Sequence, residues 1–423
     1  MHYLNEQNIL IFLIQFTLLL SLSGSLGELF RKWGQPSLTA ELLVGVIMGP
    51  TIMGRFMPLW HKAIFPDDLI QQNMLETAAW IGVLFFLLDA GLKINFISAW
   101  KQRGATLKIA LTDIVIPMVC SFIPCFLLPD AYLIDPNHRF IFATFMATVM
   151  TISSLPITAK VLYDLKIFKT DLGSLIMSAL SINDIVGWLI FTLVLGFHTQ
   201  KTLNIFEIFT IAGATFIFTA LCFSIGRKVV DKAIHTIENK KMPQPGIPLK
   251  FICILGALCG TITLSIGIHA LFGFFIAGIM AGGSRALSEN VRQIISQMVH
   301  AIFVPLFFIN IGLKVDFFEN FNLFLVALIS IVGIGGRFLG AWLGVNFTDI
   351  PRTNRLPIAI AHTPGGFMEI VVGLLALEFQ LISEPMFVAI VFGAIMSSIL
   401  VGPWFSYSLR KLNNTLSIYT HRE

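Results

Sequence analysis

Long apolar runs, separated by short polar segments, repeat along the whole chain. A helix needs about 20 mostly apolar residues to cross the hydrocarbon core of a bilayer, and about 13 runs are candidates for such helices. We expect these spans at residues 8–29, 38–58, 75–97, 105–128, 140–163, 172–197, 204–225, 248–267, 269–284, 299–313, 321–347, 356–378 and 384–408. Only Gly267–His269 separates the eighth span from the ninth, so this boundary is the weakest. The pattern predicts an all-α polytopic membrane protein.

The composition supports a membrane location. Hydrophobic residues make up 56% of the 423 residues and charged residues only 12%, whereas an average soluble domain has about 25% charged residues. This charge is too scarce to cover the surface of a soluble protein of this size, which excludes a cytosolic globule and a disordered chain. The five cysteines lie in apolar runs without CxxC spacing, which indicates small buried side chains rather than a disulfide scaffold.

The positions of the basic residues predict the orientation. Cytoplasmic loops of membrane proteins carry an excess of Lys and Arg, and about 22 basic residues fall inside and about 5 outside if the N-terminus is outside and the C-terminus cytoplasmic. The longest loop, residues 226–247, is basic and divides the chain near its middle. We interpret it as a cytoplasmic linker between two halves; binding of lipid or of a partner protein is the alternative.

Short stretches of the two halves resemble each other. Leu84–Phe96 reads LFFLLDAGLKINF and Leu306–Phe317 reads LFFINIGLKVDF, while Gly45–Gly49 (GVIMG) is similar to Gly278–Gly282 (GIMAG). The members of each pair are seven crossings apart, and an odd separation means opposite orientation in the membrane. Chance similarity between Leu- and Phe-rich helices is the alternative for any one pair. The common offset favours an inverted repeat, which is frequent in secondary transporters.

Two spans are interrupted by proline at matching positions of the halves. Pro156 lies in the fifth span, and Pro364 precedes Gly365 and Gly366 in the twelfth. Proline prevents a complete ladder of helix hydrogen bonds, and irregular backbone is tolerated at membrane depth only where it is buried in protein or lines a watery cavity. We expect two discontinuous helices that cross near the midplane, with facing half-helix ends. A simple proline kink is the alternative.

A few ionisable residues lie inside the expected spans, where charge is costly and marks candidate functional sites. Asp184 lies in the middle of the sixth span beside Asn183. A lone carboxylate binds a proton or a desolvated cation, and this competition is enough to couple opposite movements of the two. Arg337 lies in the middle of the eleventh span and needs a carboxylate or the negative C-terminal ends of the broken helices as a partner. Glu369 is a candidate partner of Arg337, a second proton site or a gate.

Other polar residues at depth have simpler interpretations. We expect Asp89 to form an ion pair with Lys93, and we assign no role to Asp113. His269 and His362 are interpreted as hydrogen-bonded packing residues, the more common role of a lone histidine in a membrane protein.

At these residues the chain resembles the cation:proton antiporter superfamily, and most of all the branch with bacterial potassium-efflux and sodium/proton antiporters and plant cation/proton exchangers. The resemblance covers nearly the whole chain. It is carried by GQPSLTAELLVGVIMGPTIMG (Gly34–Gly54), LFFLLDAGLKINF, TISSLPITAKVL (Thr151–Leu162), LSINDIVGW (Leu180–Trp188), FGFFIAGIMAGG, FVPLFFINIGLKVDF, GGRFLGAWLG and HTPGGFMEIVVG.

The resemblance implies a single exchanger domain over residues 1–423. Its mobile core bundle would lie around residues 140–197 and 321–378, and the first, second, eighth and ninth spans would form a scaffold for a homodimer. Transport would be elevator-like. The protein would reside in the bacterial inner membrane among its lipids, with no soluble regulatory domain, so that any such regulation would need a separate subunit.

The resemblance also implies roles for individual residues. Asp184 would exchange a proton for a cation, and Asn183 stands where some relatives have a second aspartate, an arrangement associated with electroneutral exchange. Residues of the first broken helix would supply further oxygen ligands, and Arg337 would face the carboxylates. The ligands implied in this helix are Thr151, Ser153 and Ser154. Many relatives have Thr-Pro-Arg-Gly-Glu in the twelfth span, where this chain has Thr363–Phe367 (TPGGF), with Glu369 two places later.

Together these observations predict an antiporter that exchanges Na⁺ or K⁺ for H⁺ without a cofactor. A gated potassium-efflux pathway and a membrane sensor that has lost transport are the alternatives. No metal-ligand cluster or nucleophile–base pair appears at helical spacing, which argues against an intramembrane enzyme. The composition and motifs give no reason to expect a nucleic-acid partner.

Overall fold

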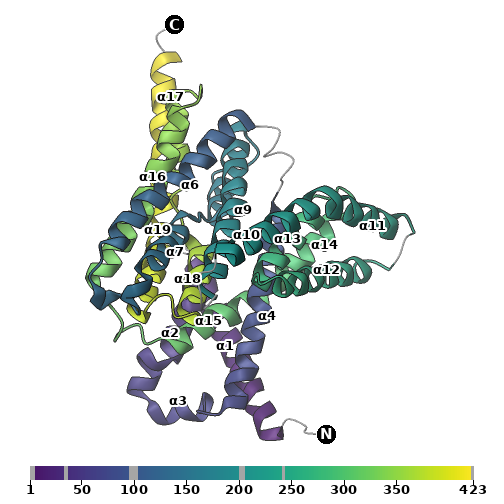
Figure 1. Cartoon of the computed structure of the whole chain (residues 1–423), viewed down its shortest axis with the longest axis vertical. Coiled ribbons are helices and arrows are strands. Elements are labelled where there is room, and N and C mark those ends of the chain that lie inside the picture. The colour runs from purple at the N-terminus through teal and green to yellow at the C-terminus, as the bar shows by residue number, and fades with distance from the viewer. Residues whose placement is uncertain (1–4, 33–36, 95–102, 200–204, 241–242, 421–423) are drawn as a thin grey trace. The chain divides into compact units, whose positions relative to one another are not determined.

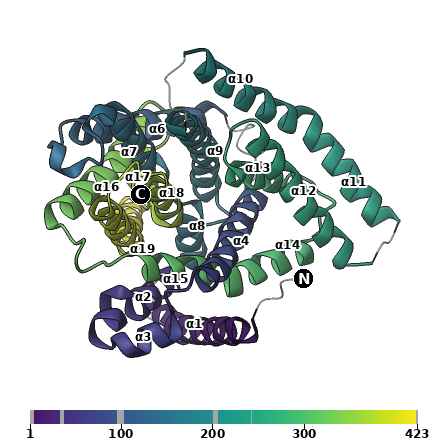
Figure 2. The ribbon, with the colours of Figure 1, turned by 60° about the horizontal axis from the view of Figure 1, so that its bottom comes forward.

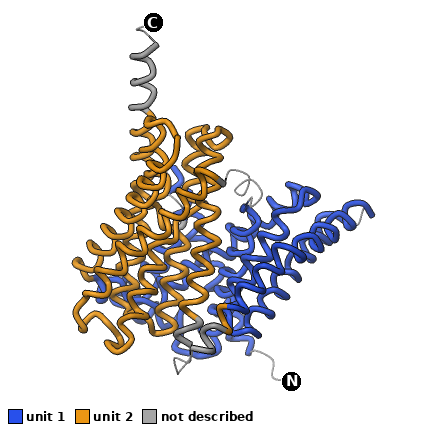
Figure 3. Tube along the Cα trace, turned by 45° about the horizontal axis from the view of Figure 1, so that its top comes forward, with its two compact units in different colours: residues 1–94, 213–321 blue, residues 95–212, 322–423 orange. Residues whose placement is uncertain are grey.

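The computed structural model describes residues 5–32, 37–94, 103–199, 205–240 and 243–420, and within these ranges its regular secondary structure is helical (Figure 1). By their contacts the residues divide into two compact units, which Figure 3 draws in different colours. Unit 1 comprises residues 1–94 and 213–321, and unit 2 comprises residues 95–212 and 322–423.

Unit 1 contains most of the expected first, second, third, eighth, ninth and tenth spans. Figure 2 shows α1, α2 and α3 together at its lower edge, and α1 contacts both of the others. The elements of unit 1 are α1 (Glu6–Lys32), α2 (Ser37–Met48), a π-helical turn (Pro50–Gly54), α3 (Pro58–Ile64), α4 (Leu69–Lys93), a second π-helical turn (Cys222–Gly226), α11 (Arg227–Asn239), α12 (Gly246–Ser265), α13 (Ala270–Gly282), α14 (Glu289–Met298), a third π-helical turn (Val299–Phe303) and α15 (Val304–Lys314).

Unit 2 contains the two proline-interrupted spans and the helices packed around them. Helix α10 (Ile205–Leu221) begins in unit 2 and ends in unit 1. The other elements of unit 2 are α6 (Arg103–Phe126), two short 3₁₀ turns (Asp130–Tyr132 and Pro136–His138), α7 (Arg139–Thr151), α8 (Leu155–Asp164), α9 (Asp171–Thr199), α16 (Leu323–Asn346), α17 (Arg352–Ala361), α18 (Gly366–Glu378) and α19 (Glu384–Thr420).

The all-α fold class is confirmed. Within the described ranges, eleven helical stretches are long and apolar enough to cross a membrane, and two shorter apolar helices, Thr39–Gly54 and Ala270–Gly282, stand where the second and ninth spans are expected. The expected count of 13 crossings stays a prediction. The expected boundary between the eighth and ninth spans at Gly267–His269 is confirmed, because Gly267 has a φ of +81° and His269 accepts a hydrogen bond from the Leu271 N–H at the start of α13.

Most of the segment 226–247 is helical, and its role as a cytoplasmic linker between the two halves stays a prediction. Residues Arg227–Asn239 form α11, which packs on α12 and α13. Val230, Ile234 and Ile237 recur at helical spacing and are buried, while Lys228 and Lys232 are exposed. Because the segment also contains many basic residues, this apolar stripe is difficult to recognise from the sequence.

Glycines bring the helices of unit 1 into close contact. A Cβ at Gly278 would lie 2.2 Å from the Leu88 carbonyl oxygen of α4, and one at Gly45 of α2 would lie 2.3 Å from the Ile309 carbonyl oxygen of α15. Small residues allow such backbone approach between membrane helices. The two similar glycine motifs of the sequence therefore both serve helix packing.

The expected ion pair of Asp89 is confirmed, and it has additional members. Lys93 Nζ lies 2.6 Å from Asp89 Oδ2, and His300 Nε2 lies 3.1 Å from the same oxygen. The repeat partner of Lys93 is Lys314, which lies 3.0 Å from Glu76. Each lysine of the repeated Gly-Leu-Lys motif thus has a carboxylate partner.

Gly278→Ala tests the close contact of α13 with α4. The added methyl group would meet the Leu88 carbonyl oxygen, so we expect the free energy of unfolding to fall by about 1–3 kcal/mol. Thermal melting of the purified protein in detergent micelles measures the effect. Gly24→Ala is the matched control, because an added Cβ there meets no heavy atom within 4 Å; equal melting temperatures of the two variants would contradict the packing argument.

Candidate ion-binding site

Two interrupted helices meet in unit 2. The first interruption lies between the end of α7 at Thr151 and the start of α8 at Leu155, and the second between α17 and α18. The two are hydrogen-bonded to each other, because the Ser154 N–H donates to the Pro364 carbonyl over 2.6 Å and Ser153 Oγ donates to the His362 carbonyl over 3.1 Å. The two discontinuous helices expected from the sequence are therefore present.

The Pro-Gly-Gly sequence is required by the geometry of the second interruption. Gly366 has a φ of +56°, and a Cβ there would lie 2.4 Å from Ile157 Cδ1 and 2.7 Å from Ser154 Oγ. A Cβ at Gly365 would overlap the Glu369 carboxylate, 1.5 Å from Oε2. Pro156 stands in the first turn of α8, where a missing N–H costs nothing.

Arg337 of α16 satisfies carbonyl groups at both interruptions. Its side chain is 1% exposed, and Nε donates to the Thr363 carbonyl over 2.9 Å while Nη1 donates to the Met150 carbonyl over 3.2 Å. Nη2 lies 3.4 Å from Glu369 Oε2. The sequence predicts either a carboxylate or the negative C-terminal ends of the broken helices as the partner of Arg337, and the structure contains both.

A polar network that the sequence did not reveal ties α6 and α9 to the interruptions. Asp113 Oδ2 accepts a hydrogen bond from Asn183 Nδ2 over 3.1 Å and lies 2.7 Å from His362 Nδ1. The oxygen of the Asn183 amide faces the Ser153 N–H at 3.4 Å. Asn183 therefore connects a carboxylate to the first interruption. The sequence does show that Asp113 is an ionisable residue inside an expected span, which marks it as a candidate functional residue. Nothing in the sequence shows that Asp113 and His362 are partners.

Asp184 is buried next to this network. It is 2% exposed, and its helix α9 packs against α7, α8 and α17. Gly187, one turn further on, faces the first interruption, because a Cβ there would lie 2.9 Å from Ile152 Cγ1. The structure thus places Asp184 on a helix that contacts both interrupted helices.

Several buried polar atoms of this region have no hydrogen-bond partner within the part of the chain that the structure describes. They are Asp113 Oδ1, Ser154 Oγ, Asp184 Oδ1 and His362 Nε2. The hydroxyl of Thr151, by contrast, donates to the Ala147 carbonyl over 2.7 Å. Three of the four atoms are oxygens, the ligand type that Na⁺ and K⁺ accept.

The comparison with known families decides what kind of protein carries this site. A sequence profile described as "Sodium/hydrogen exchanger, transmembrane" matches residues 17–410. The chain belongs to this sodium/hydrogen exchanger family. The resemblance to the cation:proton antiporter superfamily is thereby confirmed, and the exchanger chain is a multi-pass integral membrane protein.

Named relatives of this exchanger agree with the family. Cation/H(+) antiporter 18 from Arabidopsis thaliana is 27% identical over 403 residues, an alignment that covers 92% of this chain and 48% of the plant protein. The chain thus spans about half the length of that relative. Na(+)/H(+) antiporter NhaS4 from Synechocystis sp. is 26% identical over 405 residues, with 95% of this chain and 97% of that protein covered.

A solved structure supports the fold of the exchanger independently. The sodium proton antiporter MjNhaP1 from Methanocaldococcus jannaschii superposes with a TM-score of 0.71 over 96% of this chain and 99% of that chain, at 16% identity. At this identity the match establishes the fold.

Arg337→Met tests whether the guanidinium holds the two interruptions together. It leaves the buried Glu369 carboxylate without its partner, so we expect a loss of about 3–5 kcal/mol in the free energy of unfolding. The double variant Arg337→Met/Glu369→Gln removes the unpaired charge and should recover part of the loss. Thermal melting in micelles measures both, with Arg352→Met at an exposed position of α17 as the matched control. A double variant that melts no higher than Arg337→Met would contradict the pairing.

Proposed function

We propose that the protein is a secondary antiporter that exchanges a monovalent cation, Na⁺ or K⁺, for H⁺. The observation that carries this proposal is the buried Asp184 carboxylate, which has an oxygen without a hydrogen-bond partner and lies on a helix packed against two interrupted helices. The relatives named as cation/H(+) and Na(+)/H(+) antiporters support the same function.

The exchange follows from competition for one carboxylate. An ionised carboxylate is costly in a low-dielectric interior, so Asp184 is stable there when it holds either a proton or a cation, but not when it holds neither. A bound cation would take Asp184 Oδ1 and Ser154 Oγ as oxygen ligands, with Asn183, Ser153 and Thr151 in the surrounding shell. Release of the cation to one side of the membrane leaves the carboxylate free to accept a proton from that side.

The same competition favours electroneutral exchange. With a proton or with a monovalent cation, Asp184 carries the same net charge of zero. Asn183 does not titrate, and its amide is already used between Asp113 and Ser153. One proton therefore moves for each monovalent cation.

Arg337 and Glu369 would support transport without binding the cation. In their ion pair the charges of the two side chains neutralise each other where the two interrupted helices meet. Arg337 also donates to backbone carbonyls at both interruptions, and its positive charge keeps a transported cation away from these carbonyl groups. Glu369 in the first turn of α18 is then a charge partner and a candidate gate. Asp113 and His362 position Asn183.

We further propose that access alternates by an elevator-like movement. All the residues of the site belong to unit 2, which makes unit 2 the candidate for the mobile core, while unit 1 would form the scaffold of a homodimer. The N-terminus would be outside and the C-terminus cytoplasmic in a bacterial inner membrane, with regulation by a separate subunit as an additional possibility. A gated efflux pathway or a sensor without transport needs no titratable carboxylate at this place, so Asp184 favours exchange.

Asp184→Asn should abolish exchange, because the amide neither binds a proton near neutral pH nor neutralises a cation. The measurement is pH-gradient-driven Na⁺ or K⁺ uptake into proteoliposomes, with an expected loss of at least 100-fold. Asp171→Asn, at the exposed first turn of the same helix, removes the same charge and should leave transport within twofold.

Two results would count against the proposal. Exchange that survives in Asp184→Asn would show that another group couples the two ions. Cation flux through the unmodified protein without proton counterflow would instead favour the gated pathway.

A further inference from the structure

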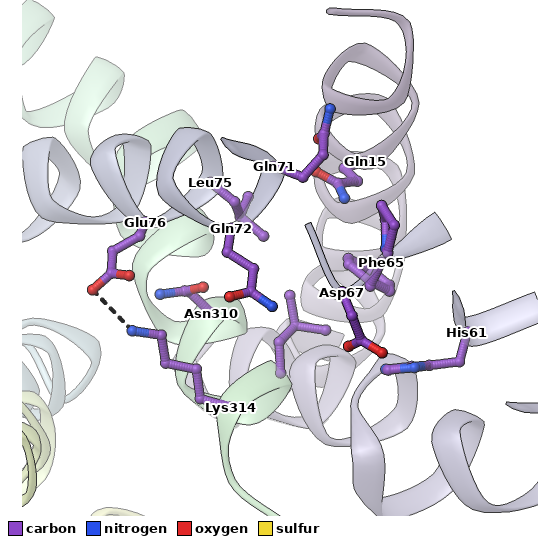
Figure 4. Close-up of a pocket in the computed structure, with 12 residues that line it drawn as sticks. Gln15, His61, Phe65, Asp67, Gln71, Gln72, Leu75, Glu76, Asn310 and Lys314 are labelled. Atoms are coloured by element: carbon purple, nitrogen blue, oxygen red, sulfur yellow. Dashed lines mark ion pairs between the residues drawn. The ribbon is translucent and has the colours of Figure 1, made fainter. Parts of the chain in front are cut away.

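Unit 1 contains a cavity that is separate from the residues of the candidate transport site. Its volume is about 420 Å³, and its walls come from α1, the α3–α4 region and α15. Figure 4 shows the amides of Gln15 and Gln71 at the upper side of the view, Lys314 and Glu76 to the left, and Asp67 and His61 to the right. Ligand pockets are commonly about 300–1,000 Å³, so this cavity has the size for a small organic molecule.

Two buried glutamines line this cavity, and the amide oxygen of each is without a hydrogen-bond partner among the described residues. Gln15 and Gln71 are each 2% exposed. Gln15 Nε2 donates to the Ile64 carbonyl over 2.7 Å, and Gln71 Nε2 donates to the Asn8 carbonyl over 2.6 Å. Because a carbonyl only accepts, these bonds fix which end of each amide is nitrogen. The remaining amide oxygens, Gln15 Oε1 and Gln71 Oε1, have no hydrogen-bond partner among the described residues.

The charges at the cavity favour a cation. Lys314 lies 3.0 Å from Glu76, so its positive charge is already balanced. Asp67 adds a further negative charge at an exposed position of the wall. Burial lowers the pKa of His61, the nearby Asp67 carboxylate opposes this effect, and the positive charge of Lys62 adds to it. Among the described residues, the wall therefore offers one carboxylate without an ion-pair partner and two amide oxygens without a hydrogen-bond partner.

Apolar side chains complete the wall. Phe65, Leu75 and Leu313 line the cavity together with the polar groups. A dehydrated Na⁺ or K⁺ makes no use of such a surface and fills only a small part of the volume. A molecule with one cationic end and one hydrocarbon end matches both the polar and the apolar part of the lining, and an aromatic ring such as that of Phe65 also attracts a cation.

From this arrangement we propose that the cavity binds a small organic cation with a primary ammonium or guanidinium group. The N–H groups of the ligand donate to Gln15 Oε1, Gln71 Oε1 and the Asp67 carboxylate, and its hydrocarbon part packs against Phe65 and Leu75. This site is distinct from the Asp184 site, and the proposal does not depend on transport.

Binding of simple probes to the full chain tests the proposal. We would titrate benzylammonium and benzylguanidinium into the purified protein in maltoside micelles by calorimetry, with benzyl alcohol as the neutral analogue of similar shape. At least one of the two cations should bind at least tenfold more tightly than the alcohol. Binding of the alcohol with equal affinity to both cations, or no saturable binding of either cation, would overturn the proposal.

Matched variants locate the binding. Asp67→Asn should weaken binding of the cation at least fivefold, because it removes the uncompensated carboxylate. Asp68→Asn removes the same charge one residue away, outside the cavity lining, and should change affinity less than twofold. Both positions are at least partly exposed, so both variants are expected to fold, and their melting temperatures check this.

A third variant separates this site from the transport site. Asp184→Asn should retain probe binding, even if it abolishes exchange. Loss of probe binding in Asp184→Asn would place the probe at the transport site and overturn the proposal. Equal effects of Asp67→Asn and Asp68→Asn would also overturn it, because the carboxylate would then act only through the general surface charge.

Discussion

The requirement that backbone groups at membrane depth find partners governs the arrangement of unit 2. Two helices stop and restart there, and each interruption frees N–H and carbonyl groups that no lipid can satisfy. The structure meets the requirement by placing the interruptions against each other. Ser154 donates to Pro364, and Arg337 of a third helix donates to carbonyls on both sides. The crossing, the glycines that permit it and the buried arginine are consequences of this one constraint.

The same low-dielectric interior gives the carboxylates different roles. Glu369 has Arg337 as a counter-charge, and Asp113 has Asn183 and His362 as hydrogen-bond partners. Asp113 Oδ1 and Asp184 Oδ1 both lack a hydrogen-bond partner among the described residues. Asp113 has His362 within ion-pair distance, whereas Asp184, which is equally buried, has no basic side chain within that distance in the described ranges. Its charge therefore depends on what enters the site. A group in this position is suited to exchange one small cation for another, whereas its neighbours are suited to hold the site in place.

The sequence predicted which segments form helices better than it predicted which helices contact each other. The apolar runs, the two interruptions and the two options for Arg337 all follow from local patterns and from the cost of charge in a bilayer, and the structure contains each of them. The network of Asp113, Asn183 and His362 joins residues 70 and 249 positions apart. A pattern of apolar residues places each of them at depth, but it does not say which helix faces point at each other.

The segment 226–247 shows a second limit of the sequence. Its basic residues dominate the pattern, whereas the apolar spacing of Val230, Ile234 and Ile237 decides that residues 227–239 form a helix. Gln15, in the cavity of unit 1, is another example. In the sequence it is one polar residue in an apolar helix, whereas in the structure its hydrogen bond to the Ile64 carbonyl fixes the direction of its amide. Such orientation comes from tertiary contacts and has no signal in the sequence.

In the proposed mechanism one carboxylate, Asp184, holds either a proton or a monovalent cation. The most direct test of this mechanism is the release of protons when Na⁺ or K⁺ is added to the purified protein in weakly buffered micelles, with the amount of bound cation measured in parallel. Because the cation must displace the proton from the same group, we expect about one proton released per bound cation, none with N-methylglucamine chloride, and none in Asp184→Asn. Cation binding without proton release, or undiminished release in that variant, would rule out a single shared carboxylate.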